Sequence, residues 1–149
     1  MKTLATFFML LLIGQILCAQ EKKPWSVDRL CGRVDHVEEI PDRKNANTYT
    51  ETRKALRDVA LALYERRDSE ACCNSSSLAD KITTNRSGDF DFRNKKAGLY
   101  WLTTNWHGKQ YQIAVEYKPE KDSVTKCSQQ GISVDSAGNA NWWVTVTVD

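Results

Sequence analysis

Apolar and polar side chains alternate along the second half of the chain. The alternating segments are residues 89–92, 100–103, 111–117 and 142–148. Because successive side chains of a strand point to opposite faces of a sheet, this period of two indicates strands with one buried face. Short segments rich in Gly, Asn and Lys separate them, which is typical of antiparallel strands joined by turns.

The first half of the chain carries fewer signals of this kind. Residues 30–37 and 81–84 predict two strands, whereas the polar residues 38–54 and 118–141 predict two long surface loops. If residues 59–65 also form a strand, the chain has about seven short strands. That number suits a sandwich of two antiparallel sheets.

Residues 48–67 fit two patterns. In a helix, the apolar residues of this segment share one face, and Thr48 with Glu51 matches a capping box. In a strand, one face carries Val59, Leu61 and Leu63, and the other face carries Ala60, Ala62 and Tyr64. Local propensity slightly favours the helix, and the pattern alone leaves both interpretations open.

The alternation also predicts which side chains fill the core. Along each expected strand, the residues expected in the core lie on one face. The predicted core consists of Val34, Val59, Leu61, Leu63, Phe90, Phe92, Tyr100, Leu102, Ile113, Val115, Val144 and Val146.

Four tryptophans are candidate ligand-binding residues. Trp101 and Trp143 fall on the faces opposite the predicted core, and Trp106 and Trp142 lie at strand ends. Exposed indole rings could stack on sugars or anchor a protein partner. In the alternative interpretation, the long loops or the lead-in with Trp25 cover these rings.

A longer motif lies between Thr83 and Leu102. Residues 83–92 read Thr-Thr-Asn-Arg-Ser-Gly-Asp-Phe-Asp-Phe, and residues 98–102 read Gly-Leu-Tyr-Trp-Leu. This order resembles the signature of carboxypeptidase regulatory-like domains. In that family a Thr-containing strand, a polar turn ending in Gly, a Phe-x-Phe pair and a Gly-x-Tyr-x-Leu strand follow one another.

Two upstream segments extend the resemblance. Residues 30–35 resemble the family's first strand, and residues 55–64 resemble its second strand. The resemblance implies an all-β fold, a seven-stranded antiparallel prealbumin-like (Ig-like) β-sandwich with two long loops, over residues 30–149. It also implies that residues 59–65 form a strand rather than a helix.

The chain departs from the family in the length of two links. The links over residues 38–55 and 118–141 are longer than the family's, so we expect any special function there. Prealbumin-like enzymes that hydrolyse purine-derived substrates depend on His, Arg and a Tyr-Arg-Gly-Ser-type ending. This chain ends Val-Thr-Val-Thr-Val-Asp, so that activity is not supported. The resemblance instead implies a non-enzymatic binding or interaction module.

The first 19 residues have the order of a secretory signal peptide. A lysine stands near the start, residues 4–13 are apolar, and small Ala19 follows a polar break. Because the apolar run is shorter than the ~20 residues of a membrane-spanning helix, we expect cleavage after Ala19 rather than an anchor. We do not expect a lipid on Cys18, since Leu17 stands where a lipoprotein site needs a small residue. Residues 20–29 then form a flexible lead-in to an exported domain, secreted or periplasmic.

Four cysteines follow the expected cleavage point: Cys31, Cys72, Cys73 and Cys127. In an oxidising compartment this even number favours two disulfides, for which three pairings exist. A bond between the adjacent Cys72 and Cys73 strains the backbone and is the least favoured of the three. We therefore expect Cys31 and Cys127 each to pair with one of the adjacent cysteines. A redox or metal site is the alternative, but it lacks Cys-x-x-Cys spacing and nearby histidines.

No catalytic, metal or cofactor motif stands out in the sequence. His36 and His107 are not in a metal-ligand spacing, and we expect both to be surface histidines. Asp89 and Asp91 could serve acid–base chemistry or bind calcium, but further oxygen ligands are missing, so a solvated strand face is expected. Beyond the signal peptide, 20 basic residues face 19 acidic ones. This balance offers no broad basic face, and nucleic acid is not an expected partner.

The sequence therefore predicts an exported, non-enzymatic binding module of the carboxypeptidase regulatory-like type. Its partner would be a protein or a glycan in the envelope or the extracellular space. The alternative is a carbohydrate-binding domain that uses the tryptophans. A small hydrolase is a third hypothesis, which would need His36 or His107 beside an acidic residue in a pocket.

Overall fold

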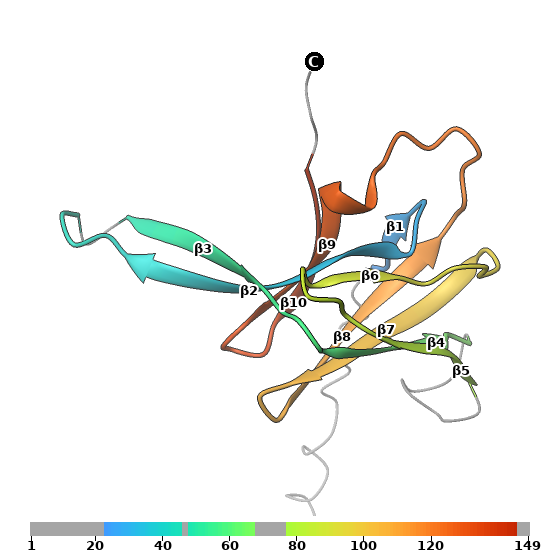
Figure 1. Cartoon of the computed structure of the whole chain (residues 1–149), viewed down its shortest axis with the longest axis horizontal. Helices are drawn as coiled ribbons and strands as arrows, with labels where there is room; N and C mark the ends of the chain where they lie inside the picture. The colour runs from blue at the N-terminus through green and yellow to red at the C-terminus, as the bar shows by residue number, and fades with distance from the viewer. Residues whose placement is uncertain (1–22, 46–47, 68–76, 146–149) are drawn as a thin grey trace, which may run out of the picture.

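The computed structural model describes residues 23–45, 48–67 and 77–145, which form an all-β domain of two mixed sheets (Figure 1). The β8 sheet has the order β1 (Trp25–Val27), β8 (Lys109–Tyr117), β7 (Gly98–Trp106), β4 (Ala60–Glu65) and β5 (Leu78–Thr83). The β2 sheet has the order β10 (Ala140–Val144), β9 (Gln130–Asp135), β2 (Cys31–Pro41) and β3 (Tyr49–Ala55), and β6 (Asp89–Asp91) also pairs with β2.

The two sheets are consistent with a β-sandwich, but the strand count differs from the prediction. The described residues form ten strands rather than seven. Two pairs, β1 with β8 and β2 with β9, are parallel, so the expectation of purely antiparallel sheets is wrong. Both parallel pairs involve a strand that the sequence pattern concealed, β1 in the expected lead-in and β9 in an expected loop.

The ambiguous segment around residues 59–65 is a strand. It forms β4, which pairs antiparallel with β5 on one side and with β7 on the other. Leu61 and Leu63 are completely buried, while Ala60, the first residue of the strand, is exposed. The helix interpretation is therefore wrong, because pairing on both edges satisfies the backbone of this segment and outweighs its local propensity.

The core follows the predicted alternation almost throughout. All predicted core residues from Val34 to Val115 are buried. Val144 is the exception, with 53% of its surface exposed, because it ends the edge strand β10. Trp142, two residues earlier on the same face, is buried instead and packs edge-on against Phe90 at 6.2 Å between ring centroids. Val146 lies outside the described residues.

The predicted loop over residues 38–55 is largely a two-stranded ribbon. β2 continues to Pro41, and its pairing with β3 runs from Asp35 opposite Ala55 to Pro41 opposite Tyr49. The ribbon extends away from the rest of the domain (Figure 1). From Glu38 onward the side chains on both faces of the ribbon are exposed. A ribbon that is wet on both sides has no alternation of apolar and polar residues, which is why its sequence resembles a loop.

Two other expected irregular segments contain strands. The expected loop over residues 118–141 includes the short 3-10 helix η2 (Cys127–Gln129), β9 and the start of β10. Within β9, Gln130, Ile132 and Val134 are buried. The expected flexible lead-in holds β1, which pairs with residues 115–117 of β8. No helix in the described part of the chain is long and apolar enough to cross a membrane.

One disulfide joins Cys31 at the start of β2 to Cys127 in η2. The expectation that each of these cysteines pairs with Cys72 or Cys73 is therefore wrong, and those two cysteines lie outside the described residues. The parallel β2–β9 pair explains the error, because it brings the two ends of a 96-residue stretch together. Beside the bond, the Gln130 amide donates hydrogen bonds to the carbonyls of Arg29 and Cys31.

Candidate functional site

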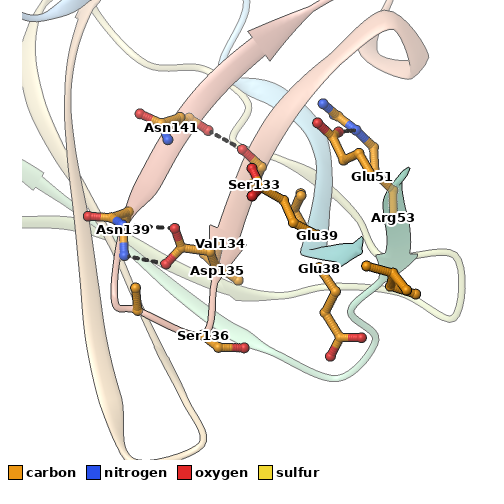
Figure 2. A pocket seen from close by; sticks show the side chains of 13 residues that line it. Glu38, Glu39, Glu51, Arg53, Ser133, Val134, Asp135, Ser136, Asn139 and Asn141 are labelled. Carbon is orange, nitrogen blue, oxygen red and sulfur yellow. Dashed lines mark hydrogen bonds and ion pairs between the residues drawn. The ribbon is translucent and has the colours of Figure 1, made fainter. Parts of the chain in front are cut away.

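An acidic groove of about 580 Å³ is the candidate site. It lies on the outer face of the β2 sheet, between the β2–β3 ribbon and the hairpin formed by β9 and β10 (Figure 2). Its lining consists of Val37, Glu38, Glu39, Ile40, Glu51, Arg53, Ser133, Val134, Asp135, Ser136, Ala137, Asn139 and Asn141. The groove thus combines the two regions, 38–55 and 118–141, where the sequence placed any special function.

Strand register explains why these side chains meet. Side chains alternate between the faces of β2, so Val37 and Glu39 point outward together. The antiparallel register sets Arg53 opposite Val37 and Glu51 opposite Glu39. The parallel register sets Asp135 on the other side of Val37. Three neighbouring strands therefore place polar or charged side chains on one face around the apolar Val37.

The charge of the groove is unbalanced. Three carboxylates of the lining, those of Glu39, Glu51 and Asp135, lie on the outer face with one guanidinium, that of Arg53, and a fourth carboxylate, that of Glu38, points to the opposite face of β2. Arg53 Nε lies 2.6 Å from a carboxylate oxygen of Glu51 and neutralises it. Glu39 stands directly opposite Glu51, and no cation of the described residues pairs with it. Like charges directly opposite on a sheet destabilise it, so this arrangement favours a ligand that brings positive charge.

The carboxylate of Asp135 forms hydrogen bonds within the turn between β9 and β10. The Asn139 backbone amide and side-chain amide each donate to its carboxylate at 2.8 Å. Partial burial by itself raises the pKa of Asp135, but hydrogen bonds from the Asn139 side chain and from the amides of residues 137–139 hold the pKa below its usual value. The carboxylate therefore stays ionised and fixes the shape of the groove wall.

Trp143 lies on the same face as the groove, between two guanidinium groups. The Arg33 and Arg53 guanidinium carbons lie 5.8 and 5.5 Å from its ring centroid. Arg33 in turn makes a bidentate contact with Asp35, at 2.8 and 3.1 Å, and the Asp35 side chain is completely buried. These charged neighbours cover part of the Trp143 ring. Arg53 contacts both this ring and the groove, so Trp143 lies next to the groove.

The other three candidate tryptophans lie in separate environments. Trp142 belongs to the core. Trp101 of β7 points out of the β8 sheet, where the Arg66 guanidinium lies 4.8 Å from its ring. Trp106 contacts His36 and His107, at 4.4 and 4.2 Å between ring centroids. Because Trp101 and Trp143 lie on outer faces of different sheets, they do not form one platform for a sugar.

His36 is buried, so the expectation of a surface histidine is wrong for this residue. Its Nε2 lies 3.3 Å from Ser136 Oγ, and its Nδ1 lies 3.5 Å from a carboxylate oxygen of Glu38. Figure 2 shows Glu38 and Ser136 at the same end of the groove, away from the Glu51–Arg53 pair. Sequence reasoning missed this set because Ser136 is 100 residues from His36 and lies beyond an unrecognised strand.

His107 is exposed, as expected, in the two-residue turn between β7 and β8. Both turn residues have positive φ, 49° for His107 and 73° for Gly108, which matches the right-handed twist of a tight hairpin. The turn keeps His107 beside Trp106 and outside the groove. It therefore serves as a natural comparison for the buried His36.

Asp89 and Asp91 each have a local partner. Asp89 accepts a hydrogen bond from the Asn85 side chain at 3.1 Å, and Asp91 pairs with Arg93 at 2.9 Å. Among the described residues, no group of three His, Cys, Asp or Glu side chains is placed to hold a metal ion. These two aspartates are accounted for by the turn and strand that contain them.

No protein-family model matches this chain, and no curated protein or solved structure matches it either. Function is therefore inferred from the groove and its charges. Membership of the carboxypeptidase regulatory-like family rests on the resemblance of residues 83–102 alone and is therefore a proposal.

Proposed function

We propose that this chain is an exported binding module of the carboxypeptidase regulatory-like type, whose acidic groove holds a basic segment of a protein partner. The Cys31–Cys127 disulfide supports an oxidising compartment outside the cytoplasm. The signal-peptide pattern of residues 1–19 supports export. The motif of residues 83–102 supports the family, since Phe90, Phe92, Tyr100 and Leu102 form core as that resemblance implies.

The observation that carries the binding proposal is the pair Glu39 and Glu51. These carboxylates stand directly opposite each other on an exposed face, and Arg53 neutralises one of them. A lysine or arginine side chain of a partner would pair with Glu39 and relieve its repulsion with Glu51. Complementary charge of this kind raises specificity and the rate of association more than raw affinity.

The uncharged side chains of the groove are also able to contact a peptide. Ser133 and Asn141 line one wall, and Ile40 at the ribbon end is 48% exposed. Hydroxyl and amide groups can bond to a peptide backbone, and the exposed isoleucine offers an apolar contact. A glycan-binding site would instead need aromatic rings that stack on a sugar from one surface. The four candidate tryptophans lie in separate parts of the domain and do not form such a surface.

Calorimetric titration of the purified chain with a lysine-rich hexapeptide tests this function. We expect binding to the lysine peptide and none to the matching glutamate peptide. The double variant Glu39→Gln/Glu51→Gln should bind the lysine peptide about tenfold more weakly, since each exposed ion pair contributes up to about 1 kcal/mol. Glu120→Gln, which removes an exposed carboxylate from the loop after β8, is the matched control and should bind normally.

Two results would contradict the proposal. One is equal affinity of the double variant and the wild type for the lysine peptide. The other is binding of neutral glycans in the same titration without binding of the peptide, which would favour the carbohydrate-binding alternative. The double variant is expected to fold, because it removes a like-charge contact and one exposed ion pair, that of Glu51 with Arg53, which contributes at most about 1 kcal/mol.

A further inference from the structure

Ser136, His36 and Glu38 form a chain of three polar groups at one end of the acidic groove. Ser136 Oγ lies 3.3 Å from His36 Nε2, and His36 Nδ1 lies 3.5 Å from Glu38 Oε1. Both ring nitrogens of the imidazole thus have a partner, and the carboxylate selects the tautomer with a proton on Nδ1. That tautomer leaves the lone pair of Nε2 facing the serine hydroxyl, which is the order of a nucleophile, a base and an orienting carboxylate.

The serine is held in place by its turn. The Tyr111 hydroxyl donates to the Asp135 carbonyl at 2.9 Å, and Lys109 Nζ donates to the Ser136 carbonyl. Burial raises the pKa of Tyr111, so its hydroxyl stays protonated and remains a donor. The Asp135–Asn139 hydrogen bonds close the same turn from within. Ser136 itself is exposed and lines the groove, where a substrate can reach its hydroxyl.

The imidazole is held from the other side. His36 is only 7% exposed, and its ring packs against Trp106 with 4.4 Å between the centroids. The indole limits rotation of the imidazole away from Ser136. A buried base beside an exposed serine is a more specific arrangement than a surface histidine, because both groups are positioned before any ligand arrives.

We propose that Ser136 is a nucleophile that accepts the acyl group of a carboxylic ester, with His36 as its general base and Glu38 as the positioning carboxylate. Ser136 Oγ forms a bond to the ester carbonyl carbon as its proton passes to His36 Nε2. The bond between that carbon and the leaving oxygen then breaks, and the departing alcohol takes the proton from the imidazolium. The products are an acyl-serine and a free alcohol, and no oxidant or metal is required.

The surroundings favour a particular class of ester. The carboxylate of Glu38 lies close to Ser136, and three further carboxylates and one guanidinium line the rest of the groove, so an ester with a cationic acyl group is favoured over one with an anionic acyl group. Lys109 adds a positive charge at Ser136 itself, which favours the negative charge that develops on the carbonyl oxygen. This reaction goes beyond the binding function and does not depend on it.

Covalent labelling of the purified full chain tests the proposal. The chain is incubated with an uncharged fluorophosphonate and, separately, with 4-nitrophenyl esters of a trimethylammonium acid and of a dicarboxylic acid, and peptide mass spectrometry locates the label. We expect phosphonylation and acylation at Ser136, faster with the cationic than with the anionic ester. His36→Gln should slow labelling at Ser136 by about 100-fold or more, the size expected for loss of a general base.

Matched variants separate chemistry from folding. Ser87→Ala removes an exposed hydroxyl in the turn before β6, outside the groove, and His107→Gln removes the exposed neighbour of Trp106, so both should leave labelling of Ser136 unchanged. Because His36 is buried, its variant could unfold, and thermal melting checks this. Glu38→Gln changes a mostly exposed side chain, keeps the fold and should still slow labelling about tenfold. Absence of label from wild-type Ser136, or unchanged labelling in both Glu38→Gln and a folded His36→Gln, would overturn the proposal.

The outcome is distinguishable from failure of the binding function. The uncharged fluorophosphonate carries no charge for the groove carboxylates to attract, so labelling of wild-type Ser136 by this reagent does not require that the chain bind a lysine peptide. Label at Ser136 without calorimetric binding of the peptide would overturn only the binding function, and peptide binding without label at Ser136 would overturn only the acylation.

Discussion

His36 Nε2 and Ser136 Oγ lie 3.3 Å apart although 100 residues separate them in the chain. The parallel pairing of β2 with β9 creates this contact, because it sets His36 beside Val134 and the next turn of the chain carries Ser136 back over the imidazole. The same pairing sets Cys31 near Cys127 and places Asp135 on the groove face. The pairing of these two strands thus brings together the disulfide cysteines, the residues of the groove wall and the contact between Ser136 and His36.

The disulfide should make a large contribution to stability. Cys31–Cys127 closes a stretch of 96 residues, for which the chain-entropy relation gives about 4 to 5 kcal/mol. Cys127→Ser should therefore lower the free energy of unfolding by a few kcal/mol in urea titrations. Peptide mapping of the unreduced wild type provides the control. A peptide that joins Cys31 to Cys72 or Cys73 would contradict the assigned bond.

The close approach of β2 and β9 requires glycine at position 131. A Cβ atom there would lie 1.9 Å from the Arg33 carbonyl oxygen, which belongs to the backbone and cannot move aside alone. Gly131→Ala should cost more than about 3 kcal/mol or prevent folding. Gly98→Ala is the matched control, since its Cβ would meet nothing closer than Tyr100 Cε2 at 3.9 Å. Equal melting temperatures of the two variants would refute the assigned register.

Trp143 should stabilise the domain through its two guanidinium contacts. Trp143→Leu keeps an apolar cover over this face but removes the π system that attracts Arg33 and Arg53. We expect a loss of about 1 to 2 kcal/mol, as for two partly exposed cation–π contacts. Trp25→Leu, at a 46% exposed ring, should change the free energy of unfolding much less. Denaturant titrations followed by circular dichroism compare the two, and a smaller loss for Trp143→Leu would argue against these contacts.

Asp135 should make stability depend on pH. Its pKa in the folded state lies below its usual value, so the carboxylate stabilises the fold fully above about pH 4 and loses this effect as the pH falls through the folded-state pKa. Asp135→Asn should therefore lower the melting temperature at pH 7, and the difference from wild type should shrink in acid. Asp122→Asn, at an exposed loop carboxylate, is the control. A difference that grows in acid would contradict the sign of the shift.

The strands that the sequence predicted correctly are those with one solvent-exposed face and one buried face. Leu61 and Leu63 of β4, and Phe90 and Phe92 in and just after β6, alternate with more exposed residues and were placed correctly in the core. The tight turn at His107 was also predictable, because a Gly beside it adopts the positive φ that a two-residue hairpin needs.

Two features of the chain explain the strands that escaped prediction. The outer half of the β2–β3 ribbon is exposed on both faces, and β9 has a buried glutamine, Gln130, where an apolar residue would mark a strand. Without those strands, the parallel pairing was invisible, and so were the contacts it makes. The sequence therefore indicated the two polar regions of the chain that form the groove. It did not predict which of their residues line the groove, or the contact between His36 and Ser136.

Carboxyl footprinting of the wild-type chain tests the central claim, that the acidic groove is the binding surface. Exposed carboxylates are modified with a carbodiimide and an amine, with and without the lysine-rich hexapeptide, and mass spectrometry measures the rate at each site. The account predicts that the peptide slows modification at Glu39 and Glu51 and leaves Glu120 unchanged. Equal rates at Glu39 and Glu51 with and without bound peptide would contradict it.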